Sequence, residues 1–262
     1  MGNLTFNNIG DSYFLTGIQG ADGSDLRTPT DVRSQKDGGI VHRFFHGHML
    51  PVIDGYFKAS TVSSRNTFED TLKGYLNSIL RADGKWRMVP SGKAERFLTA
   101  RLYQPVVITP TDGIVHSFTF GLITSREPFW GDYAETDTTI ASGANANVTN
   151  GGNTDSYPIF EVYAASSGFS YQFTLTNTTT GQKIETVDMS IAPFDPVLGG
   201  DHVEIDTYYG TMYEIGIGSP VNKLGQLDES VSDFFTLAPG VNNISLSGDF
   251  DHVVVKSRNA WV

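Results

Sequence analysis

The stretch YQFTLTNTTTG at residues 171–181 joins a strand pattern to a turn pattern. Tyr171, Phe173 and Leu175 alternate with polar residues, so these three side chains point to one face of a β-strand. Residues 177–181 are rich in Asn, Thr and Gly, which favour turns. This combination predicts a strand that ends in a tight turn before the next strand.

Short strands of this kind follow one another through the rest of the C-terminal half, which shows no helical periodicity. Ala238-Pro239-Gly240 marks a further turn between them. This spacing is typical of a sandwich. We therefore expect an antiparallel β-sandwich over residues 156–262. The expected strands are 159–163, 171–176, 183–191, 203–206, 211–215, 242–246 and 253–256.

The N-terminal half combines one helix with several strands. Apolar residues recur at helical spacing from Phe68 to Leu80, which predicts a helix at about residues 67–82 that begins at Asn66 or Thr67. Segments 52–62, 86–89, 97–107 and 115–122 are rich in β-branched and aromatic residues. We expect a mainly β fold whose first domain is a β-barrel or sandwich-like unit with one α-helix.

A chain of 262 residues predicts two domains. Hydrophobic periodicity disappears from residue 131 to residue 156, and residues 142–153 are small, polar and uncharged. We interpret residues 136–155 as a linker or crossover. The expected domains are therefore residues 1–135 and 156–262.

The charge balance argues against a chain that wraps nucleic acid. The formal net charge is -11 and the sequence pI is near 4.8, whereas phosphate contacts depend on dense Lys and Arg. An acidic wall would repel DNA that slides through a pore, but solubility is the simpler explanation and the one we favour.

The sequence offers no signal for a disulfide, a secretion leader or a membrane span. It contains no cysteine. Its start lacks a basic segment followed by an apolar core, and no apolar run approaches the length of a span. We expect a soluble protein without membrane insertion.

Two groups of polar residues could suggest a metal site. His42, His46 and His48 lie close together but match no zinc motif, so we favour structural roles for them. His202, Glu204 and Asp206 alternate with Val203 and Ile205, as in any half-buried strand. We therefore predict no metal and no cofactor.

We also predict no enzymatic activity, because no nucleophile elbow, phosphate loop, dinucleotide fingerprint or HExxH motif is present. Aromatic rings in the second half could stack on sugars, although such residues are more often part of a core. The rings considered are Phe160, Tyr163, Tyr208, Tyr209 and Tyr213.

Several stretches are more specific than composition, and together they resemble the distal tail proteins of long-tailed phages (siphophages). The C-terminal half carries, in the family's order, DSYPIFEV (155–162), FTLTNTTTG (173–181), GDHVEIDT (200–207), LAPGVNNI (237–244) and a closing RNAW (258–261). The N-terminal half carries GHMLPVIDGY (47–56), LKGYL (72–76) and RLY (101–103). The family's glycine-arginine entry is only loosely present as Gly47-His48, and residues before Val41 match poorly.

The resemblance implies a structural virion protein at the phage tail tip, made in the host cytoplasm. It implies a homo-hexameric ring that the first domain builds around a channel for DNA, with a galectin-like second domain that projects outward. Such a ring joins the tail tube protein to tip or baseplate hub proteins. A ring needs two complementary patches on each subunit, which unpaired strand edges can supply.

We expect the ring contacts to come from residues 52–59 and 101–107. The candidate interface residues are Val52, Ile53, Tyr56, Phe57, Arg101 and Tyr103. The alternative function is a carbohydrate-binding adhesin that recognises host-surface glycans with the second domain.

Overall fold

A computed structural model describes residues 13–20, 26–27, 30–32, 39–41, 45–46, 48–78, 84–88, 96–125, 127, 129–132, 134–164, 172–187, 202–216 and 218–262. The chain divides into two compact units, residues 1–131 with Val262 and residues 132–261. The first boundary lies close to the expected one at residue 135, but the second unit begins well before residue 156.

The described part of the first unit contains one α-helix and ten strands. They are β1 (Tyr13–Gln19), β2 (Leu26–Arg27), β3 (Thr30–Val32), β4 (Gly39–Val41), β5 (Phe45–His46), β6 (Val52–Lys58), α1 (Val62–Ser78), β7 (Gly84–Met88), β8 (Arg96–Asp112), β9 (Val115–Thr124) and β10 (Trp130–Gly131). Two antiparallel strand pairs, β2 with β5 and β3 with β4, form small sheets of their own.

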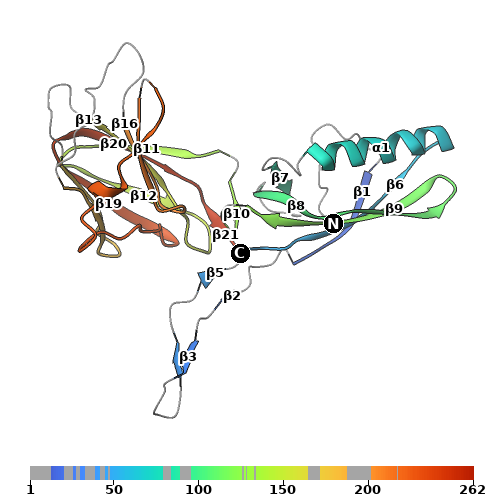
Figure 1. The fold of residues 1–262 in the computed structure, drawn as a ribbon, viewed down its shortest axis with the longest axis horizontal. Helices are drawn as coiled ribbons and strands as arrows, with labels where there is room; N and C mark the ends of the chain where they lie inside the picture. Colours follow the sequence, from blue (N-terminus) through green and yellow to red (C-terminus); the bar gives the residue numbers. More distant parts are fainter. Residues whose placement is uncertain are drawn as a thin grey trace. The chain divides into compact units, whose positions relative to one another are not determined.

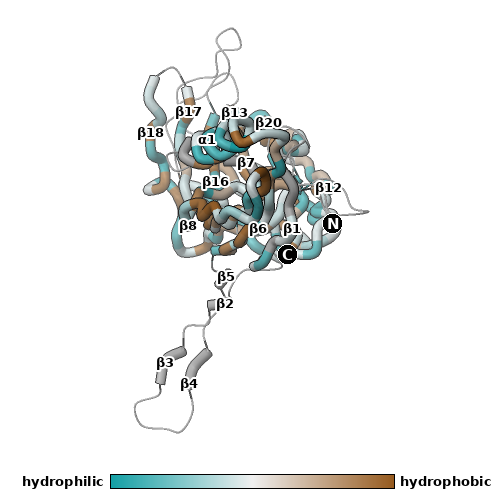
Figure 2. The backbone as a smooth tube through the Cα atoms, turned by 90° about the vertical axis from the view of Figure 1, so that its right-hand side faces the viewer, coloured by the Kyte–Doolittle hydropathy of each residue, from teal (hydrophilic) through white to brown (hydrophobic). Residues whose placement is uncertain are grey.

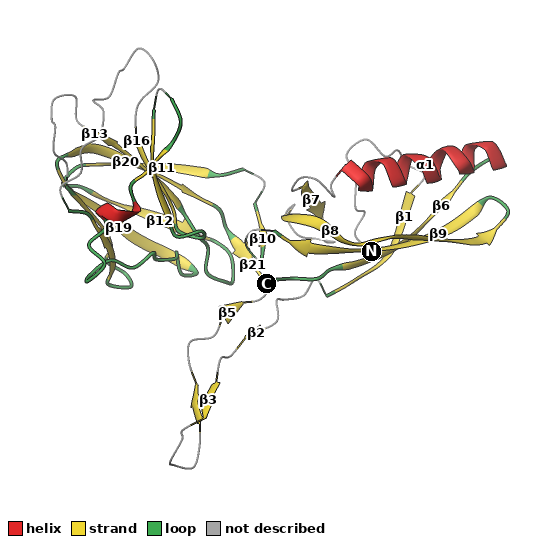
Figure 3. Cartoon of the chain, in the orientation of Figure 1, coloured by secondary structure: helices red, strands yellow, loops and turns green. Residues whose placement is uncertain are grey.

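The main sheet of the first unit is antiparallel and is covered by α1 on one face (Figures 1 and 3). Its strands lie in the order β1-β6-β9-β8-β10, and β7 pairs with β8. Among the described residues this sheet does not close on itself. The first unit is therefore an open sheet with a helix on one side, where the sequence led us to expect a barrel or sandwich-like unit.

The core of this unit follows from the alternation of side chains along each strand. On β6, Ile53, Gly55 and Phe57 are buried, while Asp54 and Tyr56 between them are half-buried. Phe118, Phe120 and Leu122 of β9 are all buried, which confirms that they share one face. The helix contributes Leu72 and Leu76 from a single stripe, and most of α1 is coloured as hydrophilic in Figure 2.

The helix begins earlier than the sequence pattern predicts. It starts at Val62, because Thr61 acts as its N-cap: the Thr61 Oγ1 atom accepts a hydrogen bond from the backbone N–H of Ser64 at 3.1 Å. The first turn buries no apolar side chain, so it lacks the periodic signal. Ile79 and Leu80, expected at the end of the helix, lie outside the described residues.

A membrane-spanning helix is not found among the described residues. The helix α1 has 17 residues and only one apolar stripe, whereas a span needs roughly 20 mostly apolar residues.

The described part of the second unit is built almost entirely from strands. They are β11 (Thr136–Ala141), β12 (Asn145–Asn150), β13 (Ile159–Ala164), β14 (Phe173–Asn177), β15 (Gln182–Glu185), β16 (His202–Asp206), β17 (Thr211–Ile215), β18 (Val221–Asn222), the 3-10 turn η1 (Leu224–Gln226), β19 (Gly240–Gly248), β20 (Phe250–Ser257) and β21 (Ala260–Trp261).

All of these strands except β21 form an antiparallel sandwich of two sheets, as the sequence predicts. One sheet has the order β11-β20-β13-β16-β17-β18 and the other the order β12-β19-β14-β15. Buried side chains from both sheets, among them Phe160, Phe173, Val203 and Leu246, form one continuous core. The burial of alternate residues on β14 matches the pattern in the opening stretch of the sequence.

The expected linker at residues 136–155 is wrong. This segment forms β11, which pairs with β20, and β12, which pairs with β19 in the other sheet. The turn between them is closed by the Ala144 N–H, which donates to the Ala141 carbonyl at 3.0 Å. Both β11 and β12 are edge strands whose side chains are mostly in contact with solvent. Each therefore buries a single large apolar side chain in the core, Ile140 from β11 and Val148 from β12. That pattern resembles a polar loop in the sequence.

Candidate subunit interface and polar sheet face

Strand β6 is a central strand and cannot extend the sheet to a neighbouring molecule. It pairs with β1 along one edge and with β9 along the other. Ile53 is 2% exposed and Phe57 is fully buried, so their inclusion as interface residues is wrong. Val52 and Tyr56 lie half-buried on the face that points away from α1. The physical reason is the two-residue period, which sends alternate side chains to opposite faces.

Strand β8 offers a different surface. β7 covers it from Arg96 to Ala100, and from residue 101 to residue 112 the sole described strand that pairs with it is β9. The other backbone edge over residues 101–112 therefore has no strand partner within the described chain. Tyr103 is 65% exposed and Val107 is 53% exposed on this segment. We call residues 101–112 of β8 the open edge.

The open edge is irregular in its first part. The register against β9 shifts between Leu102 and Gln104 and again between Gln104 and Val107, around Pro105. Proline has no backbone N–H to donate, and bulges disturb regular pairing. The residues from Val107 to Thr109 pair with β9 without a shift. A partner strand would therefore find its most regular edge there.

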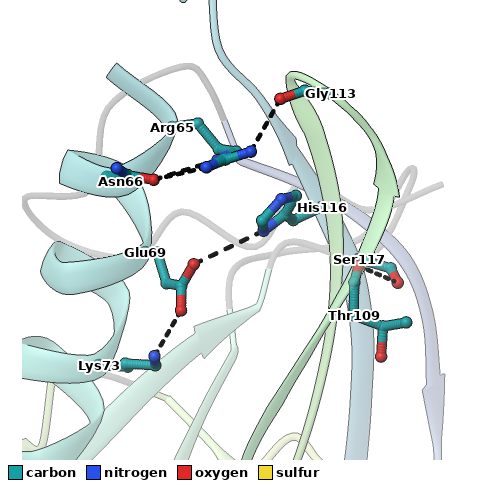
Figure 4. Close-up of polar contacts among 8 residues, drawn as sticks. All are labelled: Arg65, Asn66, Glu69, Lys73, Thr109, Gly113, His116 and Ser117. Carbon is teal, nitrogen blue, oxygen red and sulfur yellow. Dashed lines mark hydrogen bonds and ion pairs between the residues drawn. The ribbon is translucent and has the colours of Figure 1, made fainter. Parts of the chain in front are cut away.

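A set of polar contacts ties α1 to the hairpin that carries the open edge (Figure 4). Arg65 donates from Nη1 to the carbonyl of Gly113, at the hairpin tip, at 3.0 Å. Glu69 accepts a hydrogen bond from Lys73 at 2.5 Å, and its other carboxylate oxygen lies 3.6 Å from Nδ1 of His116. The hydrogen bond from Lys73 holds the pKa of Glu69 below its ordinary value. These contacts fix the hairpin against the helix.

His116 is a buried residue that the sequence gives no reason to single out. It is 5% exposed, its ring lies 5.5 Å from that of Phe57, and neither ring nitrogen has a hydrogen-bond partner within the described chain. The Glu69 carboxylate is therefore a charged neighbour of the His116 ring but does not form a hydrogen bond with it.

Of the three histidines between residues 42 and 48, the structure describes the side chain of His48 alone. His48 is exposed, whereas His42 and the side chain of His46 lie outside the described residues. The expected absence of a metal there stays a prediction.

The outward face of the larger sheet in the second unit collects several polar side chains. His202 and Glu204 extend from β16, and Glu161 and Tyr163 extend from the neighbouring β13, in pairs Glu161 with Glu204 and Tyr163 with His202. Lys256 of β20 contacts Glu161 Oε1 at 2.5 Å. The sequence pattern places His202 and Glu204 together, but it gives no sign of Glu161.

Asp206, the third polar residue of that pattern, has a separate role. It is 8% exposed, and its Oδ1 accepts hydrogen bonds from the backbone N–H groups of Tyr208 at 2.9 Å and Tyr209 at 3.1 Å. It therefore shapes the turn after β16.

The aromatic residues considered for sugar binding are mostly engaged elsewhere. Phe160 is fully buried. Tyr163 stacks on His252 with ring centroids 4.5 Å apart and lies 5.1 Å from the ring of His202, so imidazoles on both neighbouring strands flank it. Tyr208 contacts the rings of Tyr157 and Tyr209 edge to face. Of the five rings considered, that of Tyr209 is more than half exposed.

One half-open pocket of about 230 Å³ lies in the second unit. Its lining includes a single carboxylate and is otherwise mostly apolar: Ile184, Gly210, Leu224, Leu227, Glu229, Ser232 and Phe234. A pair of acidic groups, as hydrolysis of a glycosidic bond requires, is not part of this lining.

Comparison with known proteins rests on structure. No family model matches the sequence, and no curated protein matches it. The solved structure of the Dit protein (gp 19.1) of phage SPP1, described as a paradigm of the hub adsorption apparatus in phages that infect Gram-positive hosts, matches with a TM-score of 0.62. That match covers 96% of this chain and 95% of the other, at 16% identity.

The chain has the fold of SPP1 Dit.

Chains of the phage P2 baseplate in its activated conformation also match. The form with Ca gives a TM-score of 0.55 and the form with Sr gives 0.53, each at 8% identity over 97% of this chain and 91% of the other. The mainly β fold with a single helix, expected from the sequence, is thereby confirmed, and the likeness to SPP1 Dit spans both units.

Proposed function

We propose that this chain is a structural hub protein at the tail tip of a long-tailed phage. The observation that carries the proposal is the likeness to SPP1 Dit, because it extends over 96% of this chain and so includes both units. Proteins of this fold in the comparison belong to a hub adsorption apparatus and to a baseplate. Association with other tail-tip proteins in the virion follows from that role.

We further propose that the first unit closes a homo-hexameric ring and that the open edge of β8 is one of its contacts. An unpaired strand edge is a template for pairing with another chain. Tyr103 and Val107 add exposed apolar surface beside that edge. A closed ring also requires a second, different patch. The half-buried Val52 and Tyr56, on the face of the sheet away from α1, are candidates for it.

The proposed ring would let DNA pass without binding it. The net charge of -11 opposes tight contact with phosphates. The galectin-like character of the second unit and its outward placement belong to the same proposal. The adhesin alternative receives no support from the geometry, since imidazoles flank Tyr163 and Phe160 lies in the core.

Light scattering coupled to size exclusion tests the ring. The 28.6 kDa chain should give a species of about 172 kDa, which is six copies, and negative-stain images should show a ring. Changing both Tyr103 and Val107 to Lys should shift the mass toward that of the monomer, because charged edge residues oppose strand pairing.

Val62→Lys is the matched control, because Val62 is 54% exposed and belongs to α1, not to strand β8. It should leave the mass unchanged. A strict monomer for the unmodified chain at all concentrations, with or without the tail tube protein, would refute the ring. If the double variant still formed the ring, the open edge would not be one of the ring contacts.

A further inference from the structure

Three side chains of metal-ligating type converge on the outward face of the second unit. Glu161 of β13 lies directly opposite Glu204 of β16, and His202 lies two residues from Glu204 on the same face. One ligand atom from each of the three lies within 4.8 Å of the other two. His202 and Glu204 are partly exposed, and the Glu161 side chain, although mostly buried, is still 12% exposed, so an ion could reach them.

The charges at this point are incompletely balanced. Two carboxylates that face each other on neighbouring strands repel one another. Glu161 is compensated by Lys256 at 2.5 Å and by the hydroxyl of Tyr163, which donates to its Oε2 at 3.0 Å. Glu204 forms no hydrogen bond or ion pair with another described side chain. A cation placed between the two carboxylates would remove this repulsion.

The donor set selects the class of ion. One imidazole nitrogen with two carboxylate oxygens is a set that Zn²⁺ accepts, whereas Ca²⁺ and Mg²⁺ prefer oxygen ligands alone. Tetrahedral ligands at the usual zinc distances lie roughly 3.4 Å apart, so atoms within 4.8 Å of one another need only small side-chain rotations. Three protein ligands leave a fourth position for water or for a group of a neighbouring protein.

We propose that Glu161, His202 and Glu204 form a binding site for a divalent transition-metal ion of the Zn²⁺ type. Lys256 holds Glu161 in the absence of the ion and swings away when the ion binds. The metal then joins β13 to β16 through their side chains. This site does not depend on ring formation, since all its ligands come from one unit of one chain.

Isothermal titration of the untagged full chain with ZnCl2 tests the site. We expect one Zn²⁺ per chain with micromolar affinity or tighter. His202→Ala and Glu204→Gln should each weaken binding at least about tenfold, the lower end of what disturbing a metal site costs. Lys256→Met should tighten binding, because it removes the competing cation; a purely structural ion pair would show no such gain.

The matched control is His48→Ala, which deletes an exposed imidazole of the first unit, outside this cluster, and should leave the affinity unchanged. Circular dichroism checks that each variant is folded. Three outcomes would overturn the proposal. They are the absence of stoichiometric Zn²⁺ binding, a Zn²⁺ affinity of the His202 and Glu204 variants equal to that of the unmodified chain, and Ca²⁺ binding as tight as Zn²⁺ binding.

Discussion

The two units solve the same problem, how to cover an antiparallel sheet, in different ways. In the second unit two sheets cover each other, and their edge strands are short: β11 and β12 have six residues each, β15 has four and β18 has two. In the first unit a single helix covers one face of the sheet. Residues 101–112 of β8 pair with β9 alone among the described strands, so their other backbone edge is open. Short edges limit pairing with other chains, and long ones invite it.

The two units therefore differ in the surface that they leave for contacts with other chains. The second unit encloses one continuous core between its two sheets. The first unit leaves a sheet face half-buried and one edge incompletely paired, so it has surface to contribute to a larger structure. The next experiments test each side of this contrast.

Core truncation should have the largest effect and should act separately on the two units. Phe118→Ala in the first unit and Phe160→Ala in the second should each cost about 3–5 kcal/mol of unfolding free energy, because both side chains are almost fully buried. Urea denaturation followed by circular dichroism measures this. If Phe160→Ala abolished the ring while Phe118→Ala left it intact, the assignment of assembly to the first unit would be wrong.

A smaller effect on stability should show whether α1 begins after Thr61, as observed, or at Asn66 or Thr67, as the sequence pattern predicts. Thr61→Ala should cost about 1 kcal/mol of stability, because it removes the N-cap hydrogen bond to Ser64. Thr67→Ala is the control: Thr67 lies within the helix, and alanine is a good helix former, so its effect should stay within about 0.5 kcal/mol. The same urea titration decides, and a larger loss for Thr67→Ala would contradict the observed cap.

A third effect appears only at alkaline pH and concerns the second unit. Burial, followed by the hydrogen bond to Glu161, raises the pKa of Tyr163 to about 12. Since the folded pKa lies above the ordinary value of 10.0, the stabilising contribution is complete below pH 10 and is lost as the pH rises toward 12.

Ultraviolet titration of the phenolate should therefore show a late ionisation step, and Tyr163→Phe should remove that step. Persistence of the late step in Tyr163→Phe would assign it to another tyrosine.

Local patterns predicted much of this molecule. The alternation of Phe118, Phe120 and Leu122 gave their common face, and the strands around FTLTN and HVEID lie where the sequence placed them. The turn after FTLTN closes as expected: the Gly181 N–H donates to the Asn177 carbonyl at 2.8 Å, and Gly181 has a φ of 77°, which favours glycine.

Other features escaped the sequence because their signals are weak or nonlocal. The edge strands β11 and β12 each bury few apolar residues, so they look like a polar linker. The first turn of α1 faces solvent and shows no periodicity. Whether Ile53 and Phe57 or Val52 and Tyr56 face the core depends on where α1 packs, and the alternation alone does not specify that side.

By itself the sequence determined the mainly β character, the single helix and the sandwich, because hydrophobic periodicity and turn chemistry act over a few residues. The tertiary structure alone decided which strands became neighbours. That choice brought Glu161 against His202 and Glu204, and it left residues 101–112 of β8 with one described strand partner. Strand order is set by packing of the whole chain, so no local pattern encodes it.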